Sequence, residues 1–296
     1  DNLTTSIVMV MIMRKLVPDA QDRLWFDVTV IIAANSGGAF SPIGDVTTIM
    51  LWNGKQITAL GVISQIILPS FVSFVIPTLI FQQKLEGAWV LSTTKAERAA
   101  ARPSLVTRHQ RRTIFCVGVG GLCSVPAFHL LTDLPPFMGI LLVLGLLWFT
   151  TEVIYRNQDE NDPMAKRVSQ LLGKVDMTTI LFFLGILMAV AVLQSAGVLM
   201  NAANWLDHNV HNVYVINLIL GVLSSVVDNV PLVAAAMGMY PVEPSTATGY
   251  EAFFMVDGAF WEFLSYCAGV GGSILIIGSA AGVIAMGIEK ISFGWY

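Results

Sequence analysis

The sequence predicts an all-α integral membrane protein with an internal inverted repeat, re-entrant hairpins and two broken transmembrane helices. Three observations predict this class: the composition, the spacing of apolar runs and a duplicated motif. Of the 296 residues, 55% are hydrophobic and 12% are charged, which is about half the charged share of a soluble domain. Because so few charges cannot cover the surface of a soluble globule, the composition excludes a soluble enzyme, a disordered chain and a nucleic-acid binder.

Apolar runs between polar clusters define the expected elements, since a membrane helix needs about 20 mostly apolar residues. The first run, 3–13, is too short to span, and the next, 25–52, is long enough but interrupted. Further along the chain we expect spans at 57–81, 113–131, 137–154 and 177–199, an interfacial helix at 164–172, a polar segment at 200–212, short arms at 213–227 and 230–240, and an interrupted helix at 258–288. The domain division is a first repeat at 1–81, a basic loop at 82–112 and a second repeat at 113–296, with its hairpin at 213–240.

The distribution of basic residues predicts the orientation. If each long run crosses once and each pair of short arms returns to its own side, 15 of the 16 Lys and Arg residues lie on one side and Lys55 lies alone on the other. Cytoplasmic loops carry the excess of Lys and Arg, so the first side, with the loop 82–112, is predicted to be cytoplasmic. A wrong span count would place the basic residues on both sides of the membrane, so their uneven distribution supports the predicted count.

Two stretches of the chain share one order of elements. Each begins with an Asp-Asn pair, Asp1-Asn2 or Asp228-Asn229, and continues into an interrupted helix with a Gly-Gly pair and an Ile-Gly pair. The predicted topology orients them oppositely, as in the inverted repeats of secondary transporters. Irregular backbone at the membrane midplane must be buried or line a cavity, so we expect unwound backbone near a site, although close helix packing is the alternative. The matching glycines are Gly37, Gly38 and Gly44 in the first stretch and Gly271, Gly272 and Gly278 in the second.

Carboxylates in these apolar segments indicate a binding site, because a charge inside a membrane helix costs about 3 kcal/mol on insertion scales. Asp45 could instead cap a half-helix starting at Val46, and Asp228 could be a turn residue. Carboxylate, amide and hydroxyl oxygens suit a hard cation, and no Lys or Arg lies in the interrupted helices or at the hairpin tip. A carboxylate there can hold a proton or a metal ion, which is the minimum needed for cation/proton exchange. The candidate cation- and proton-binding residues are Asp1, Asn2, Thr5, Asp45, Thr47, Asp228, Asn229 and Ser279, with Asp45, Asp228 and Asn229 foremost as ligands of the metal ion.

Four motifs then resemble those of NhaD-type sodium/proton antiporters. They are DNLTT at 1–5, AANSGGAFSPIGDVTT at 33–48, DNVPLVAA at 228–235 and GGSILIIGSAAG at 271–282. The resemblance covers nearly the whole chain and implies exchange of Na⁺ or Li⁺ for H⁺, a homodimer and a bacterial inner membrane, with the lipid bilayer as partner and no cofactor. Family chains usually carry more helices before the first Asp-Asn motif, so we expect a fragment that lacks these helices and the C-terminal end.

Two alternatives stay open beside this interpretation. NhaD-type antiporters belong to the ion transporter superfamily, which also holds dicarboxylate and arsenite carriers. These anion carriers resemble one another in a Ser-Asn-Thr hairpin tip, whereas this chain has Asp-Asn there. An intramembrane aspartyl protease could use Asp45 and Asp228, since two aspartates that share a proton can activate water. Its Gly-x-Gly-Asp motif is incomplete here, because Pro42 stands in place of the first glycine. We therefore expect a transporter and not an enzyme.

Overall fold

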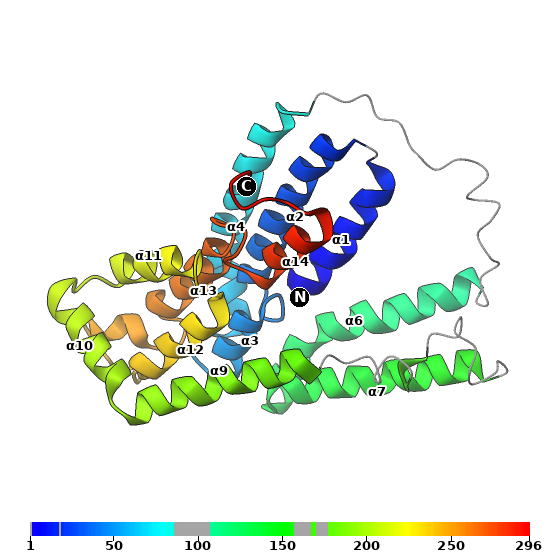
Figure 1. Cartoon of the computed structure of the whole chain (residues 1–296). Coiled ribbons are helices and arrows are strands. Elements are labelled where there is room, and N and C mark those ends of the chain that lie inside the picture. The colour runs from blue at the N-terminus through cyan, green and yellow to red at the C-terminus, as the bar shows by residue number, and fades with distance from the viewer. Residues whose placement is uncertain (1, 18, 86–106, 157–166, 170–176) are drawn as a thin grey trace. The chain divides into compact units, whose positions relative to one another are not determined.

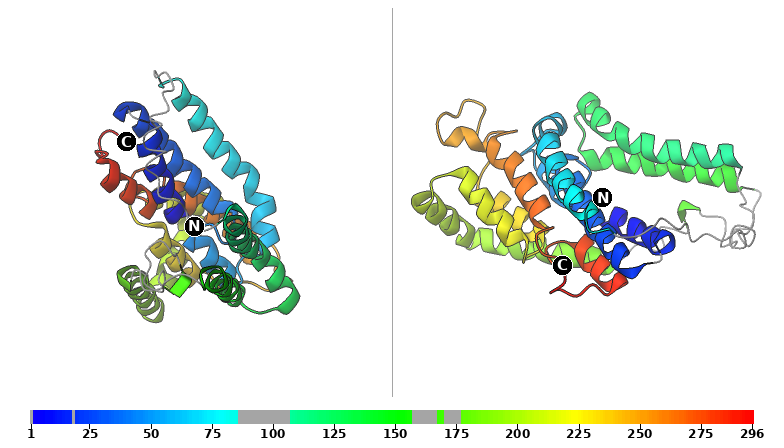
Figure 2. Two further views of the ribbon diagram at one scale, coloured as in Figure 1. Left: turned by 90° about the vertical axis from the view of Figure 1, so that its right-hand side faces the viewer. Right: turned by 90° about the horizontal axis from the view of Figure 1, so that it is seen from above.

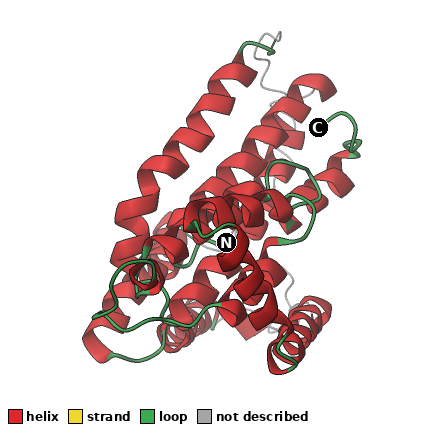
Figure 3. Ribbon diagram, turned by 90° about the vertical axis from the view of Figure 1, so that its left-hand side faces the viewer, coloured by secondary structure: helices red, strands yellow, loops and turns green. Residues whose placement is uncertain are grey.

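The computed structural model describes residues 2–17, 19–85, 107–156, 167–169 and 177–296. Within these residues all regular structure is helical, apart from an isolated bridge between Glu243 and Met255 (Figure 3). The all-α prediction is thus confirmed. The elements are α1 (Asn2–Leu16), α2 (Ala20–Phe40), α3 (Val46–Asn53), α4 (Ala59–Gln82), α6 (Arg108–Thr132), α7 (Pro136–Tyr155), α9 (Met177–Ser195), α10 (Val198–Asn209), α11 (Val213–Ser224), α12 (Asn229–Met239), the 3₁₀ helix η1 (Glu251–Phe254), α13 (Ala259–Gly271) and α14 (Ala280–Glu289).

The chain forms two compact units. One unit joins Asp1–Thr94 with Leu184–Tyr296, and the other is Lys95–Phe183. The smaller unit contains α6 and α7, which pack side by side (Figure 2). Helices α4, α6 and α7 are the three described helices that are long and apolar enough to cross a membrane individually, as the sequence predicts for these runs.

The first interrupted run is a broken helix, α2 followed by α3. Helix α2 ends at Phe40 because Ser41, with φ −95° and ψ 127°, is extended, as expected for a residue before proline. The break therefore lies between Ser41 and Asp45. Gly37 and Gly38 precede the break and are helical. The prediction that the backbone is unwound at these two glycines is therefore wrong.

The segment 200–212, predicted to be polar, is largely helical and not an extended loop. Helix α9 ends at Ser195, and α10 follows after a bend of 70° between Leu184–Ser195 and Val198–Asn209. Leu199 and Ala203 are buried at a spacing of four residues, which gives this mostly polar segment one apolar face. The expected interfacial helix at 164–172 lies outside the described residues except for 167–169, as does most of the loop 82–112.

The second interrupted run is also a broken helix, α13 followed by α14, and α11 and α12 form the short arms before it. Helix α13 lies in the core of the larger unit and packs against α2, α4 and α11. Its Phe260, Trp261 and Leu264 are completely buried. The Ser265 hydroxyl donates to the carbonyl oxygen of Ala39 on α2 at 2.9 Å. A buried hydrogen bond thus joins the first halves of the two broken helices, α13 and α2. Figure 1 shows α1, α2 and α14 close together in the same unit.

Candidate functional site

The site is built around the two breaks, where a polar residue caps each second half-helix. Asp45 is the N-cap of α3: its Oδ1 accepts from the backbone N of Thr47 at 3.3 Å, and its own N–H donates to Oγ1 of Thr48 at 3.2 Å. Ser279 is the N-cap of α14 and accepts from the backbone N of Gly282 at 3.3 Å. The capping alternative for Asp45 is therefore confirmed, but capping uses only one of its two carboxylate oxygens.

The second oxygen of Asp45 joins the two Asp-Asn motifs. Oδ2 accepts from Nδ2 of Asn2 at 3.0 Å and from Nδ2 of Asn229 at 2.9 Å. These residues begin α1 and α12, so the two stretches that match in sequence converge on one carboxylate. Asp45 is 2% exposed, and both side-chain donors are neutral amides.

Asn35 extends this cluster across the two repeats. Its Oδ1 accepts from Asn2 at 3.1 Å, and its Nδ2 donates to the hydroxyls of Ser279 at 3.0 Å and Ser273 at 2.8 Å. Asn35 and Ser273 were not predicted as site residues from the sequence. The available signal was a single amide in an apolar run directly before Ser36-Gly37-Gly38. We call Asn2, Asn35, Asp45, Asn229, Ser273 and Ser279 the central cluster.

Two of the matching glycines allow the backbone to close around the breaks. A Cβ atom on Gly38 would lie 3.2 Å from both the Asp45 Cβ and the Gly44 carbonyl oxygen. A Cβ atom on Gly272 would lie 3.2 Å from the Ser279 Cβ and 2.8 Å from the carbonyl oxygen of Gly278. The same close approach thus occurs at equivalent places in both matching stretches. It explains why glycine is needed at position 38 although the backbone there is helical.

The other predicted site residues differ in their surroundings. Thr47 is completely buried, and its hydroxyl has no hydrogen-bond partner among the described residues. Asp228 is half-buried at the start of α12, makes no side-chain capping bond, and lies near enough to Asp45 to interact electrostatically. Thr5 is exposed on α1, and Asp1 lies outside the described residues.

The charges around the central cluster favour a cation. Helices α3, α11, α12 and α13 carry no Lys or Arg, and the cations of α1 and α2 lie at the helix ends remote from Asn2 and Asn35. The cluster offers carboxylate, amide and hydroxyl oxygens, the ligand types that suit hard cations. Its described polar atoms could therefore coordinate an alkali cation, whereas an anion would meet an uncompensated carboxylate.

Comparison with known proteins identifies the family. A family model described as "Citrate transporter" (CitMHS) matches residues 1–258. The chain belongs to the citrate transporter family. Among its relatives, sodium/proton antiporter 1 of Arabidopsis thaliana is 46% identical over the whole chain, and the chain spans about half (49%) of that protein. Sodium/proton antiporter 2 of the same plant is 44% identical, with 67% of its length covered.

Bacterial proteins are also similar to this chain. The Na⁺/H⁺ antiporter NhaD of Vibrio parahaemolyticus is 29% identical over the whole chain, with 71% of that relative covered. No solved structure matches. The resemblance to NhaD-type proteins is confirmed, and the matched family and these relatives are transporters, so the protease alternative is set aside. The chain is an integral membrane protein.

Proposed function

We propose that the chain carries the ion site of a secondary transporter that exchanges Na⁺ or Li⁺ for H⁺, with both ions competing for Asp45. The observation that carries this proposal is the buried Asp45 carboxylate, which accepts from neutral amides of both Asp-Asn motifs and has no basic partner among the described residues. The relatives named as sodium/proton antiporters support the same ions.

The geometry provides for two states of the Asp45 carboxylate. With a proton on one oxygen, the group is neutral and the amides of Asn2 and Asn229 complete its hydrogen bonding. With Na⁺ bound, the carboxylate is ionised, and rotation of either asparagine side chain replaces its donor by its carbonyl oxygen. The buried Thr47 hydroxyl offers a further oxygen. Since one carboxylate holds one ion at a time, loading of Na⁺ releases H⁺.

A second candidate is an anion carrier, because the matching family model is described as a citrate transporter. An anion would require neutral donors or cations at the helix ends. Here the Asp45 carboxylate already occupies the N-terminus of α3 and accepts the neighbouring amide donors. The charge of Asp45 therefore disfavours this alternative.

The test uses the protein reconstituted into liposomes that contain a pH-sensitive dye. A Na⁺ pulse is expected to drive proton movement, and Asp45→Asn is expected to abolish it. Asp22→Asn, which removes a carboxylate near the start of α2 outside the central cluster, is the control and should retain activity. Citrate-driven signals without any response to Na⁺ or Li⁺ would overturn the proposal.

Two further parts of the proposal rest on the resemblance. A homodimer is expected, and light scattering of the purified protein in detergent should give the mass of two chains. The bacterial inner membrane remains a prediction, since the two relatives above 40% identity are plant proteins. Localisation of the tagged protein in its own cells tests it.

A further inference from the structure

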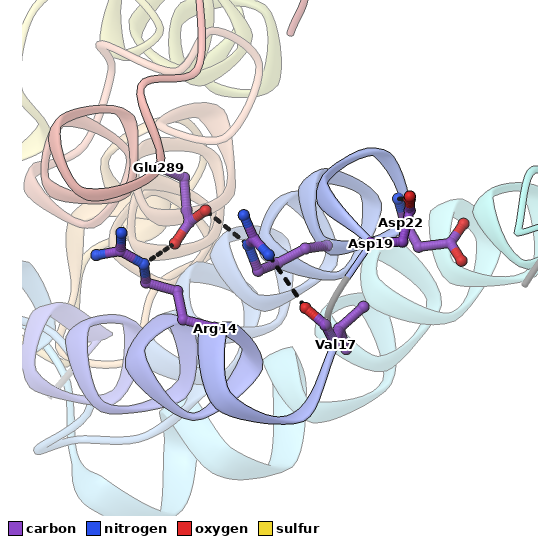
Figure 4. Close-up of polar contacts among 6 residues, drawn as sticks. Arg14, Val17, Asp19, Asp22 and Glu289 are labelled. Atoms are coloured by element: carbon purple, nitrogen blue, oxygen red, sulfur yellow. Dashed lines mark hydrogen bonds and ion pairs between the residues drawn. The ribbon is translucent and has the colours of Figure 1, made fainter. Parts of the chain in front are cut away.

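An ion-pair cluster joins the second broken helix to α1 and α2, away from the central cluster. Glu289, the last residue of α14, has a side chain that is only 2% exposed. Its Oε1 lies 2.9 Å from Nε of Arg14 on α1, and its Oε2 lies 2.7 Å from Nε of Arg23 on α2. Arg23 also donates to the carbonyl oxygen of Val17 at 3.0 Å. Figure 4 shows Arg14 and Glu289 facing each other, with Asp22 turned away.

Asp27 is a buried carboxyl group one helical turn from this cluster. It is completely buried, and neither of its oxygens has a hydrogen-bond partner among the described residues. The charged groups that act on it are Arg23 of its own helix, Arg14 of α1 and Glu289 of α14. Of the other helices packed against α2, α3 and α4 carry no charged residue, and α13 carries only Glu262 in its first turn.

The arginines are already engaged by a different carboxylate. Both Arg14 and Arg23 direct Nε to Glu289, so the ionised partner of the arginines is Glu289. A buried carboxylate without hydrogen bonds is strongly disfavoured, and such a group avoids the cost by taking a proton. The surroundings therefore favour an ionised Glu289 and a neutral Asp27.

Asp27 lies on the same face of α2 as Asn35 of the central cluster. Asp27, Ile31 and Asn35 are all buried and follow at four-residue spacing along α2, so they lie on one face of the helix. Eight residues of α-helix separate Asp27 from Asn35 by about 12 Å. Asp27 lies toward the end with Arg14 and Arg23, which the distribution of basic residues predicts to be cytoplasmic.

We propose that Asp27 is a second proton-binding site, which takes up a proton from the cytoplasmic side and passes it toward Asp45. The proton leaves water and bonds to an Asp27 oxygen, and later leaves that oxygen for the Asp45 carboxylate as Na⁺ departs. The onward transfer to Asp45 rests on the proposed exchange function. The uptake of a proton by Asp27 does not depend on that function.

Infrared difference spectroscopy tests the proton on Asp27 directly. At neutral pH the protein is expected to show the C=O band of a protonated carboxyl group, and Asp27→Asn should remove that band. Asp22→Asn is the matched control, because it removes a carboxylate from the same helix outside the cluster, and it should leave the band. If a folded Asp27→Asn protein kept the C=O band of the wild type unchanged, Asp27 would be ionised and the proposal would be overturned.

Transport measurements test the onward step. Asp27→Asn is expected to bind Na⁺ within twofold of the wild-type affinity, because the central cluster is unchanged, yet to reduce Na⁺-driven proton movement at least tenfold. Wild-type rates in the Asp27→Asn protein would overturn the transfer to Asp45. If the wild-type protein shows no Na⁺-driven proton movement, the proposed exchange fails, while the infrared band still decides whether Asp27 binds a proton.

Discussion

Asp45 combines a structural and a chemical task in one side chain. Its Oδ1 caps α3, and its Oδ2 joins Asn2 and Asn229 from the two repeats. Capping orients the carboxylate, and its partners in the described part of the chain are neutral, so none of them balances its charge. A mobile cation or a proton can then supply the missing charge.

We expect the neighbouring Thr47 and Thr48 to differ in role, with Thr47 in ion binding and Thr48 in helix capping. The Thr47 hydroxyl is buried without a hydrogen-bond partner among the described residues, whereas the Thr48 hydroxyl completes the capping box of α3. Thr47→Val should therefore weaken Na⁺ binding about fivefold, as expected for one lost oxygen ligand, with little change in stability. Thr48→Val should instead lower stability by about 1 kcal/mol. Na⁺ titration and thermal unfolding of both variants distinguish the two roles, and equal effects on both quantities would contradict this assignment.

Asp228 should influence the site through its charge alone. It is half-buried and interacts electrostatically with Asp45 without a shared hydrogen bond. Asp228→Asn should reduce Na⁺ affinity by about 3–5-fold, because a charge interaction that involves a partly exposed side chain contributes up to about 1 kcal/mol. Competition by protons should persist, since Asp45 is intact. Loss of that competition in Asp228→Asn would move the essential carboxylate from Asp45 to Asp228.

At the scale of elements, the sequence predicted both broken helices because their signals are local. Pro42 prevents Ser41 from continuing α2, and Asp45 and Ser279 are strong N-caps. Asn35 was missed because its role depends on Ser273 and Ser279, which are more than 230 residues away in the chain. Helix α10 was missed because average polarity hid its buried face, which consists of Leu199 and Ala203.

Two glycines in the broken helices should respond oppositely to substitution by alanine. The Cβ of an alanine at position 272 would lie 2.8 Å from the backbone oxygen of Gly278, so Gly272→Ala should destabilise the protein by about 1–3 kcal/mol. Gly37 is helical and no described atom lies within 4 Å of its Cβ position, so Gly37→Ala should stabilise the protein by about 0.5–1 kcal/mol. Thermal unfolding in lipid nanodiscs measures both effects. Destabilisation by Gly37→Ala would contradict the helical assignment.

At the scale of the whole molecule, the central cluster is assembled from both predicted repeats. The first repeat supplies Asn2, Asn35 and Asp45, and the second supplies the remaining members of the cluster. The site therefore depends on the fold of the larger unit and on no single motif. The predicted inverted repeat also requires a defined orientation in the membrane.

The orientation can be tested with single cysteines in a protein whose own cysteines are replaced. Lys55 is exposed between α3 and α4, and Arg108 is exposed at the start of α6. A membrane-impermeant maleimide added outside should label Lys55→Cys but not Arg108→Cys, and permeabilisation should expose the latter. External labelling of Arg108→Cys would show that the span count or the predicted cytoplasmic side is wrong.

Equilibrium binding shows whether Na⁺ and H⁺ compete for Asp45. The apparent Na⁺ dissociation constant of the purified protein would be measured as pH is lowered, beside Asp45→Asn and the Asp22→Asn control. Competition at one carboxylate predicts that the apparent constant rises about tenfold per pH unit once the site is mostly protonated. The control should follow the wild type, and Asp45→Asn should lose binding. An Na⁺ affinity that does not change with pH, or that survives in Asp45→Asn, would contradict the account.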